Sequence, residues 1–187
     1  MSDDRTRFEE LYRDTRTPLL AYLSRRAPAD DAADLLAEVY LVAWRRRADL
    51  PAGDEQRLWL YGVARRLVAE HYRTSGTRAD AEHEAGDAVN RPQSPPISAR
   101  DTAVHRALDS LNDVDRELVT LTVWERLSPA EAARVVGISA NTARVRLHRA
   151  RARLGRHPAL QALLDDDTSH PAADAAISPP VEAASAR

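Results

Sequence analysis

The sequence predicts an all-α protein made of two small helical domains that a flexible linker joins. Apolar residues recur at three- and four-residue spacings through most of the chain, and this is the spacing of one helix face. Glycine is scarce, at 6 of 187 residues, and alternating β-branched residues are absent, so strands are not expected. The helical spacing fails over residues 74–100, where Pro, Gly, Ser and charged residues replace large apolar ones. This segment is therefore predicted to be the linker, because it cannot bury enough surface to offset its ordering entropy.

Residues 1–73 form the first predicted domain, for which we expect four helices. Residues 6–27 carry a broad apolar stripe, and Pro28 ends it. Residues 29–50 begin with two aspartates and approach their end with three arginines, charges that suit the positive and negative ends of a helix. After a short connection, residues 57–73 supply a further inward stripe, in one helix or two.

Residues 101–156 form the second predicted domain, and its second half has the pattern of a helix-turn-helix. Ser128, followed by Pro129 and by Glu131, predicts a capping box at the start of one helix. Gly137 permits a tight turn, and Ser139 suits the cap of the next helix. The tail over residues 157–187 is rich in Ala, Pro and Asp and is expected to be disordered, apart from a short helix around residues 159–164.

The helix expected after Ser139 is purely basic, since no carboxylate stands between Ala140 and Arg156. Ala143, Leu147, Ala150 and Leu154 supply its buried stripe. A solvated charged face is the usual explanation of such a run, but an unpaired basic face repels itself and is best explained by phosphate. The outward residues are therefore candidates for DNA contact, in the positions from which this motif reads the major groove. They are Ser139, Ala140, Asn141, Arg144, Val145, His148 and Arg149.

Three motifs stand in order along the chain: DLLAEVYLVAW, RLWLYGVARRLVAEHYR and LSPAEAARVVGISANTARVRLHRARARL. In this order and spacing they resemble the second and fourth regions of the extracytoplasmic-function group of the sigma-70 family, bacterial RNA polymerase sigma factors. The resemblance covers residues 8–73 and 101–155. It implies a protein that binds core RNA polymerase, directs it to specific promoters and assists promoter opening. The outward residues of the basic helix would then recognise the minus-35 element.

An acidic helix face is the candidate site for polymerase binding. Asp34 and Glu38 lie four residues apart, so they share one helix face, and no basic residue one turn away neutralises them. The resemblance implies that this face, with Leu35 and Leu41, contacts the basic clamp helices of the largest polymerase subunit. It also implies the flap of the second largest subunit as a partner. Ala37 departs from the family pattern, which commonly has glutamine there.

The resemblance further assigns RLWLYGVARR and the loop before it to the unpaired minus-ten strand. Exposed bases and phosphates need stacking surfaces and cations, and this segment supplies both. The candidates are Leu50, Arg57, Trp59, Tyr61, Arg65 and Arg66. Trp59 suits packing as well, because a tryptophan beside an apolar stripe is usually part of a core. Arg66 stands where related sequences often carry asparagine.

Enzymatic activity is not expected, and neither are a metal site or a cofactor. The chain has no cysteine, its six histidines show no ligand spacing, and no glycine-rich phosphate loop is present. No apolar run is long enough to span a membrane, and the charged N-terminus resembles no signal peptide, so we expect a cytoplasmic protein without membrane insertion.

Two other functional classes stay open from the sequence. The chain could be a conventional helix-turn-helix regulator that binds duplex DNA as a dimer, with residues 8–73 as its ligand or dimerisation domain. It could also be an adaptor that docks a protein partner through the acidic helix. Under the sigma factor hypothesis, an anti-sigma factor is a further candidate partner. Transcription started in vitro with core polymerase would separate these classes.

Overall fold

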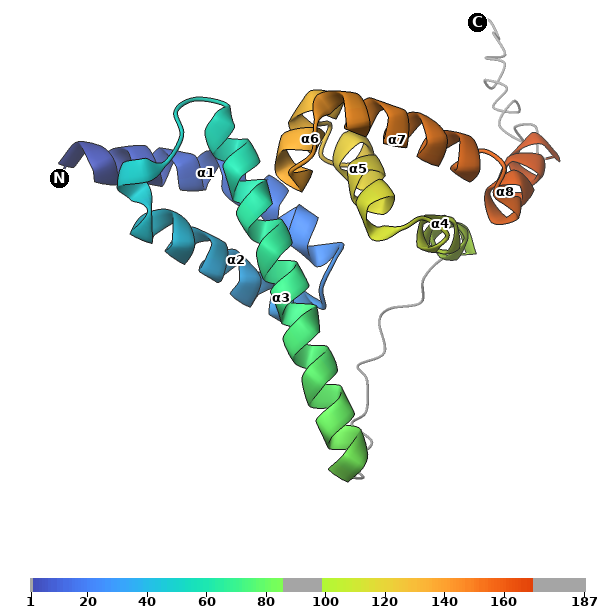
Figure 1. Ribbon diagram of the computed structural model, residues 1–187, viewed down its shortest axis with the longest axis horizontal. Helices are drawn as coiled ribbons and strands as arrows, with labels where there is room; N and C mark the ends of the chain where they lie inside the picture. Colours follow the sequence, from blue (N-terminus) through green and yellow to red (C-terminus); the bar gives the residue numbers. More distant parts are fainter. Residues whose placement is uncertain (1, 86–98, 170–187) are drawn as a thin grey trace, which may run out of the picture.

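The computed structural model describes residues 2–85 and 99–169, which form helices joined by short connections (Figure 1). The prediction of an all-α fold is confirmed, because these described residues contain no strand. The helices are α1 (Ser2–Ser24), α2 (Ala29–Arg45), η1 (Arg47–Asp49, a 3-10 helix), α3 (Glu55–Ala85), α4 (Ala99–Asp109), α5 (Asp113–Val123), α6 (Pro129–Val136), α7 (Ala140–Leu154) and α8 (Pro158–Ser169).

The helices gather in two bundles, which Figure 1 shows side by side. In the first bundle α1, α2 and α3 pack on one another, and their inward stripes supply a core that includes the fully buried Leu19, Leu23, Val39 and Leu60. The four helices expected before residue 75 are three α-helices and the short η1, because residues 57–73 form one continuous helix. In the second bundle α5, α6 and α7 pack together around Leu118, Leu121 and Leu147.

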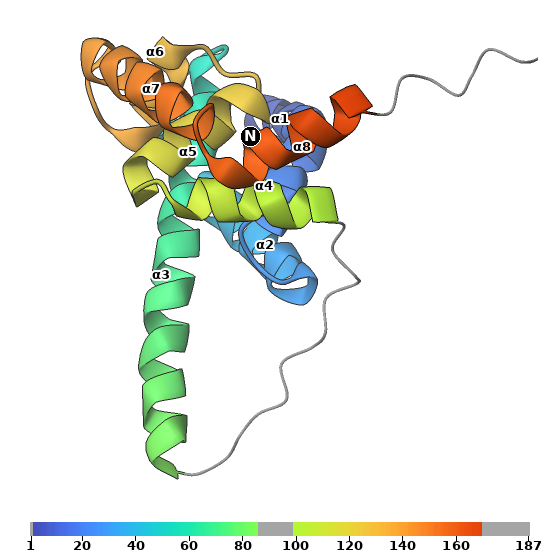
Figure 2. The ribbon, with the colours of Figure 1, turned by 90° about the vertical axis from the view of Figure 1, so that its right-hand side faces the viewer.

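Helix α3 is longer than the sequence predicts. Residues 74–85, assigned above to the linker, continue the helix to Ala85. Alanine, glutamate and arginine in this stretch are strong helix formers, and they outweigh the single Gly76. Figure 2 shows this end of α3 projecting away from both bundles. The rest of the predicted linker, residues 86–98, lies outside the described residues, and α4 begins at Ala99.

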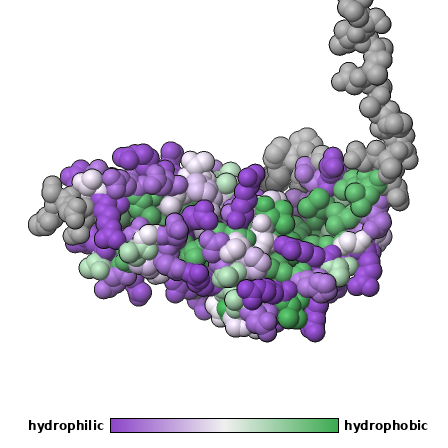
Figure 3. Space-filling view, turned by 90° about the horizontal axis from the view of Figure 1, so that it is seen from above, coloured by the Kyte–Doolittle hydropathy of each residue, from purple (hydrophilic) through white to green (hydrophobic). Residues whose placement is uncertain are grey.

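Helix α8 extends the second domain beyond residue 156. The tail is helical from Pro158 to Ser169, so the helix expected at residues 159–164 is present and is longer than predicted. Proline suits a first helical position because its missing N–H has no helical partner there. α8 folds back across α4 (Figure 2). Seen from above, the surface is mainly hydrophilic, and apolar side chains gather toward the end that carries α8 (Figure 3). Residues 170–187 lie outside the described part of the chain.

The helix-turn-helix forms as its local signals predict. The Ser128 hydroxyl accepts a hydrogen bond from the Glu131 amide at 3.3 Å, and the Glu131 carboxylate accepts one from the Ser128 amide at 2.7 Å. Gly137 ends α6 at φ 84°, in the left-handed region that a residue with a side chain adopts only with strain. Ser139 then accepts from the Thr142 amide and starts α7. The angle between the two helices is thus fixed by residues on the turn itself.

Loss of the α6 cap is expected to destabilise the second bundle. Ser128→Ala removes the acceptor for the Glu131 amide and should lower the free energy of unfolding by about 1 kcal/mol. Chemical denaturation followed by circular dichroism measures this. Ser24→Ala, an exposed serine at the end of α1, is the matched control and should change little. Equal losses in both variants would contradict a specific contribution from the cap.

Candidate nucleic-acid and polymerase interfaces

Helix α7 presents one face to the core and the opposite face to solvent. Ala143, Leu147 and Ala150 are buried against α5 and α6. The residues predicted to contact the minus-35 element all lie toward solvent, with Ala140 half-buried and the others exposed. They are Ser139, Ala140, Asn141, Arg144, Val145, His148 and Arg149. The helix therefore brings the whole predicted set together on one accessible surface.

The arginines of α7 differ in their partners. Arg146 donates to Asp115 of α5 at 2.8 Å, so its charge is paired with a carboxylate of the same domain. Among the described residues, no ion pair involves Arg144 or Arg149. Two exposed guanidinium groups on α7 thus stay available to an anionic partner.

The acidic face of α2 is exposed as predicted, with one correction. Asp34 and Glu38 lie in solvent, and Leu41 beside them is 47% exposed. Leu35 does not belong to this surface, because it is only 5% exposed and packs in the core of the first bundle. Its position beside Asp34 in the sequence turns it toward the adjacent, buried side of the helix.

The candidates for the minus-ten strand are divided between surface and core. Arg57 and Arg66 are exposed, while Leu50, Trp59 and Arg65 are half-buried. Tyr61 is corrected: it is 1% exposed, and its ring meets the buried ring of Tyr22 edge to face at 5.3 Å. Burial, with a smaller contribution from Glu125, raises the pKa of Tyr61 to about 12. Tyr61 therefore holds the bundle together and offers no stacking surface to a base.

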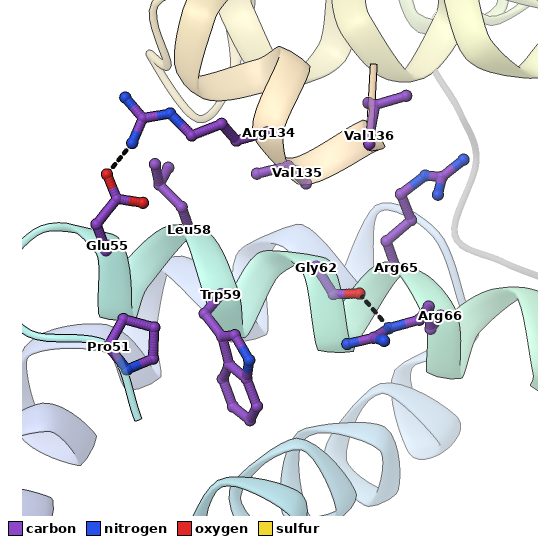
Figure 4. Close-up of a pocket in the computed structure, with 11 residues that line it drawn as sticks. Pro51, Glu55, Leu58, Trp59, Gly62, Arg65, Arg66, Arg134, Val135 and Val136 are labelled. Atoms are coloured by element: carbon purple, nitrogen blue, oxygen red, sulfur yellow. Dashed lines mark hydrogen bonds and ion pairs between the residues drawn. The ribbon is translucent and has the colours of Figure 1, made fainter. Parts of the chain in front are cut away.

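Helix α6 of the second bundle lies over this part of α3 (Figure 4). Trp59, Arg65 and Arg66 line a cavity of about 410 Å³ between the two helices. Arg134 of α6 pairs with Glu55 at the start of α3. Figure 4 shows Trp59 pointing to the opposite side of α3 from Val135 and Val136 of α6.

A cluster that sequence reasoning missed joins the two bundles. Arg25 and Arg26, which directly follow α1, pair with Glu117 of α5 and with Glu125, which follows α5. Arg25 and Glu125 lie 100 positions apart in the sequence, so no local spacing pattern predicts their contact. Their contact is a property of how the domains pack.

Within residues 2–85 and 99–169 no group of three or more His, Cys, Asp or Glu side chains is placed to hold a metal ion. No helix of that described part is both long and apolar enough to cross a membrane.

Comparison with known proteins finds similar sequences and a similar fold. The family "Sigma-70, region 4" matches residues 101–154, which run from α4 to the end of α7. The ECF RNA polymerase sigma factor BldN of Streptomyces coelicolor is 34% identical over 142 residues. The aligned segment is 73% of this chain, and the chain spans only about half of BldN, 52% of its length.

The ECF RNA polymerase sigma factor SigF of Caulobacter vibrioides is 32% identical over 137 residues, which is 71% of this chain and 74% of SigF. Among solved structures, the sigma factor RpoE of Bartonella quintana, in complex with the anti-sigma factor NepR, has the same fold. Its TM-score is 0.61 at 23% identity, and the match covers 86% of this chain and 98% of RpoE.

Proposed function

Because the chain belongs to the extracytoplasmic-function group of RNA polymerase sigma factors, we propose that it binds core RNA polymerase, directs it to specific promoters and assists promoter opening. The observation that carries this proposal is the exposed, unpaired basic face of α7 within a fully capped helix-turn-helix. The arginines of such a face contact the phosphate backbone of DNA, and the side chains at its centre contact the base edges.

The two bundles have different proposed binding partners. Residues 1–73 act as sigma region 2, in which Asp34, Glu38 and Leu41 bind the clamp helices of the largest subunit. Residues 101–156 act as sigma region 4, which reads the minus-35 element and contacts the flap of the second largest subunit. The exposed acids of α2 support this division, because a basic partner surface would neutralise them.

The minus-ten surface is smaller than the sequence predicts. Trp59, Arg65 and Arg66 line one cavity beside α3, and Arg57 lies exposed nearer the start of the helix. These residues offer one ring and several cations to an unpaired strand, as base-stacking proteins require. Catalysis belongs to the polymerase, so this chain is not itself an enzyme, and it acts in the cytoplasm with RNA polymerase.

An anti-sigma factor is a further proposed partner, since the similar RpoE was solved in complex with one. The regulator and adaptor hypotheses are less well supported. A dimeric regulator needs no acidic polymerase-binding face, and an adaptor needs no base-reading helix.

The direct test is run-off transcription of genomic fragments with the full chain and core polymerase. Specific transcripts that depend on the added chain are expected. Core polymerase that starts no transcript, although the chain binds duplex DNA, would favour the regulator hypothesis instead.

Within the minus-ten segment, Arg66→Ala should affect DNA binding and Tyr61→Ala should affect stability. Arg66 is exposed, so its loss should leave the fold stable and weaken holoenzyme binding to single-stranded promoter DNA by about 1 kcal/mol. Tyr61 fills the core, so its truncation should cost about 3 to 5 kcal/mol of unfolding free energy. Unfolding titrations and single-strand binding measure the two effects. A stable Tyr61→Ala variant that loses only DNA binding would return Tyr61 to the minus-ten surface.

A further inference from the structure

Val145 is a large apolar side chain that points from α7 into solvent. It is 43% exposed, whereas the two leucines of the same helix, Leu147 and Leu154, are buried and half-buried. Val145 lies two residues from Ala143 and two from Leu147, which both pack in the core. At about 100° per residue, this spacing turns Val145 away from the contacts of α7 with α5 and α6. The valine therefore stands at the centre of the outward face of α7.

Packing and helix stability do not account for a valine at this position. Val145 is neither part of the hydrophobic core nor packed against it. A β-branched residue also has a lower helix propensity than arginine, which fills four other exposed positions of α7. One exposed valine is common on a protein surface, but this one lies between Asn141, one turn before it, and Arg149, one turn after it. The face proposed to enter the major groove thus carries an apolar group at its centre.

The edges of the bases decide what such a group can recognise. In the major groove the C5 methyl group of thymine is the apolar feature that distinguishes one base from another. Valine has no hydrogen-bond donor or acceptor on its side chain, so it cannot pair with the polar edges of guanine or adenine. We propose that Val145 recognises a thymine of the minus-35 element by packing against its C5 methyl group. This inference rests on the function proposed above for α7, and it names a base that the helix prefers.

The contact favours thymine because it removes methyl groups of both partners from water. Cytosine carries a hydrogen where thymine carries the methyl group, so the same approach by Val145 leaves a gap beside the base. The flanking Arg144 and Arg149 supply hydrogen-bond donors for guanine edges or phosphates. Val145 therefore adds an apolar contribution to base recognition that these arginines cannot make.

The test uses the full chain bound to core polymerase. Selection from random duplexes defines the minus-35 element, and that duplex is then remade with uracil in place of each thymine in turn. Uracil lacks the C5 methyl group of thymine and keeps the same pairing with adenine. At one position the parent should lose affinity about fourfold, which is the effect expected when one methyl group is removed from a buried contact.

Protein variants show whether Val145 makes this contact. Val145→Ala should bind the thymine and uracil duplexes equally, because the protein partner of the methyl group is gone. Val145→Ile keeps an apolar side chain and should keep the fourfold difference. Val123→Ala is the matched control, since Val123 is 59% exposed at the end of α5 and lies outside the proposed DNA surface. This variant should bind every duplex as the parent does.

A second comparison adds the methyl group instead of removing it. With a cytosine–guanine pair at the same position, 5-methylcytosine should bind more tightly than cytosine in the parent and no more tightly in Val145→Ala. Circular dichroism should give all variants the helix content of the parent, because Val145 and Val123 are both exposed.

Two failures can be told apart. If the selected element has no position where the methyl group matters, or if the methyl effect persists in Val145→Ala, the thymine contact is overturned while the minus-35 role of α7 stands. If selection yields no preferred duplex, the minus-35 role is overturned, and the thymine contact with it.

Discussion

Glu38→Arg is expected to abolish binding to core RNA polymerase while leaving the protein folded. Glu38 is exposed on α2, and among the described residues no ion pair involves it or Asp34, so the change breaks no intramolecular ion pair. Against a basic partner, reversal replaces attraction with repulsion at a desolvated contact. We expect a loss of about 2 to 5 kcal/mol of binding free energy, and a larger loss when Asp34→Arg is added.

The measurement is co-purification with core polymerase, followed by a competition titration against the parent chain. Glu10→Arg is the matched control, because Glu10 is an exposed acid on α1 outside the proposed face. Circular dichroism should give all variants the same helix content. Undiminished polymerase binding by Glu38→Arg/Asp34→Arg would remove α2 from the polymerase interface, and the first domain would need another role.

The parts of the fold that the sequence predicts well are those fixed by neighbouring residues. Ser128, Glu131 and Gly137 form the expected cap and turn because each acts on backbone groups within three or four residues. The outward set on α7 follows from periodicity for the same reason. Local chemistry is sufficient for the helix-turn-helix.

The rest depends on packing that local chemistry does not specify. The sequence predicts Tyr61 and Leu35 as binding-surface residues, yet both side chains are buried in the core of the folded protein. Which flank of an apolar stripe becomes buried depends on how α1, α2 and α3 pack on one another. The pairing of Arg25 with Glu125 is a contact between domains, and nothing in either segment alone indicates it. The extension of α3 to Ala85 shows the reverse case, where helix propensity prevails over a segment expected to be irregular.

The arginines of α7 should separate into base readers and structural residues. Arg144→Ala and Arg149→Ala are each expected to cost about 1 to 3 kcal/mol of promoter binding, and Arg144, nearer the start of α7, should also relax base preference. Both side chains are exposed, so neither change should affect the fold. Arg151, further along the helix and exposed, is expected to contact phosphate, so Arg151→Ala should weaken binding to all sequences alike.

Arg146 supplies the internal control, since it is an arginine of the same helix whose charge is already paired with Asp115. Arg146→Ala should lower the stability of the second bundle and have little direct effect on base preference. The experiment titrates the full chain, with core polymerase, on the promoter duplex and on a scrambled duplex at two salt concentrations. Phosphate contacts appear as a reduced salt slope, and base contacts appear as a reduced ratio between the two duplexes. Equal effects of all four substitutions on both duplexes would make α7 a non-specific basic surface, and minus-35 recognition would then have to come from elsewhere in the complex.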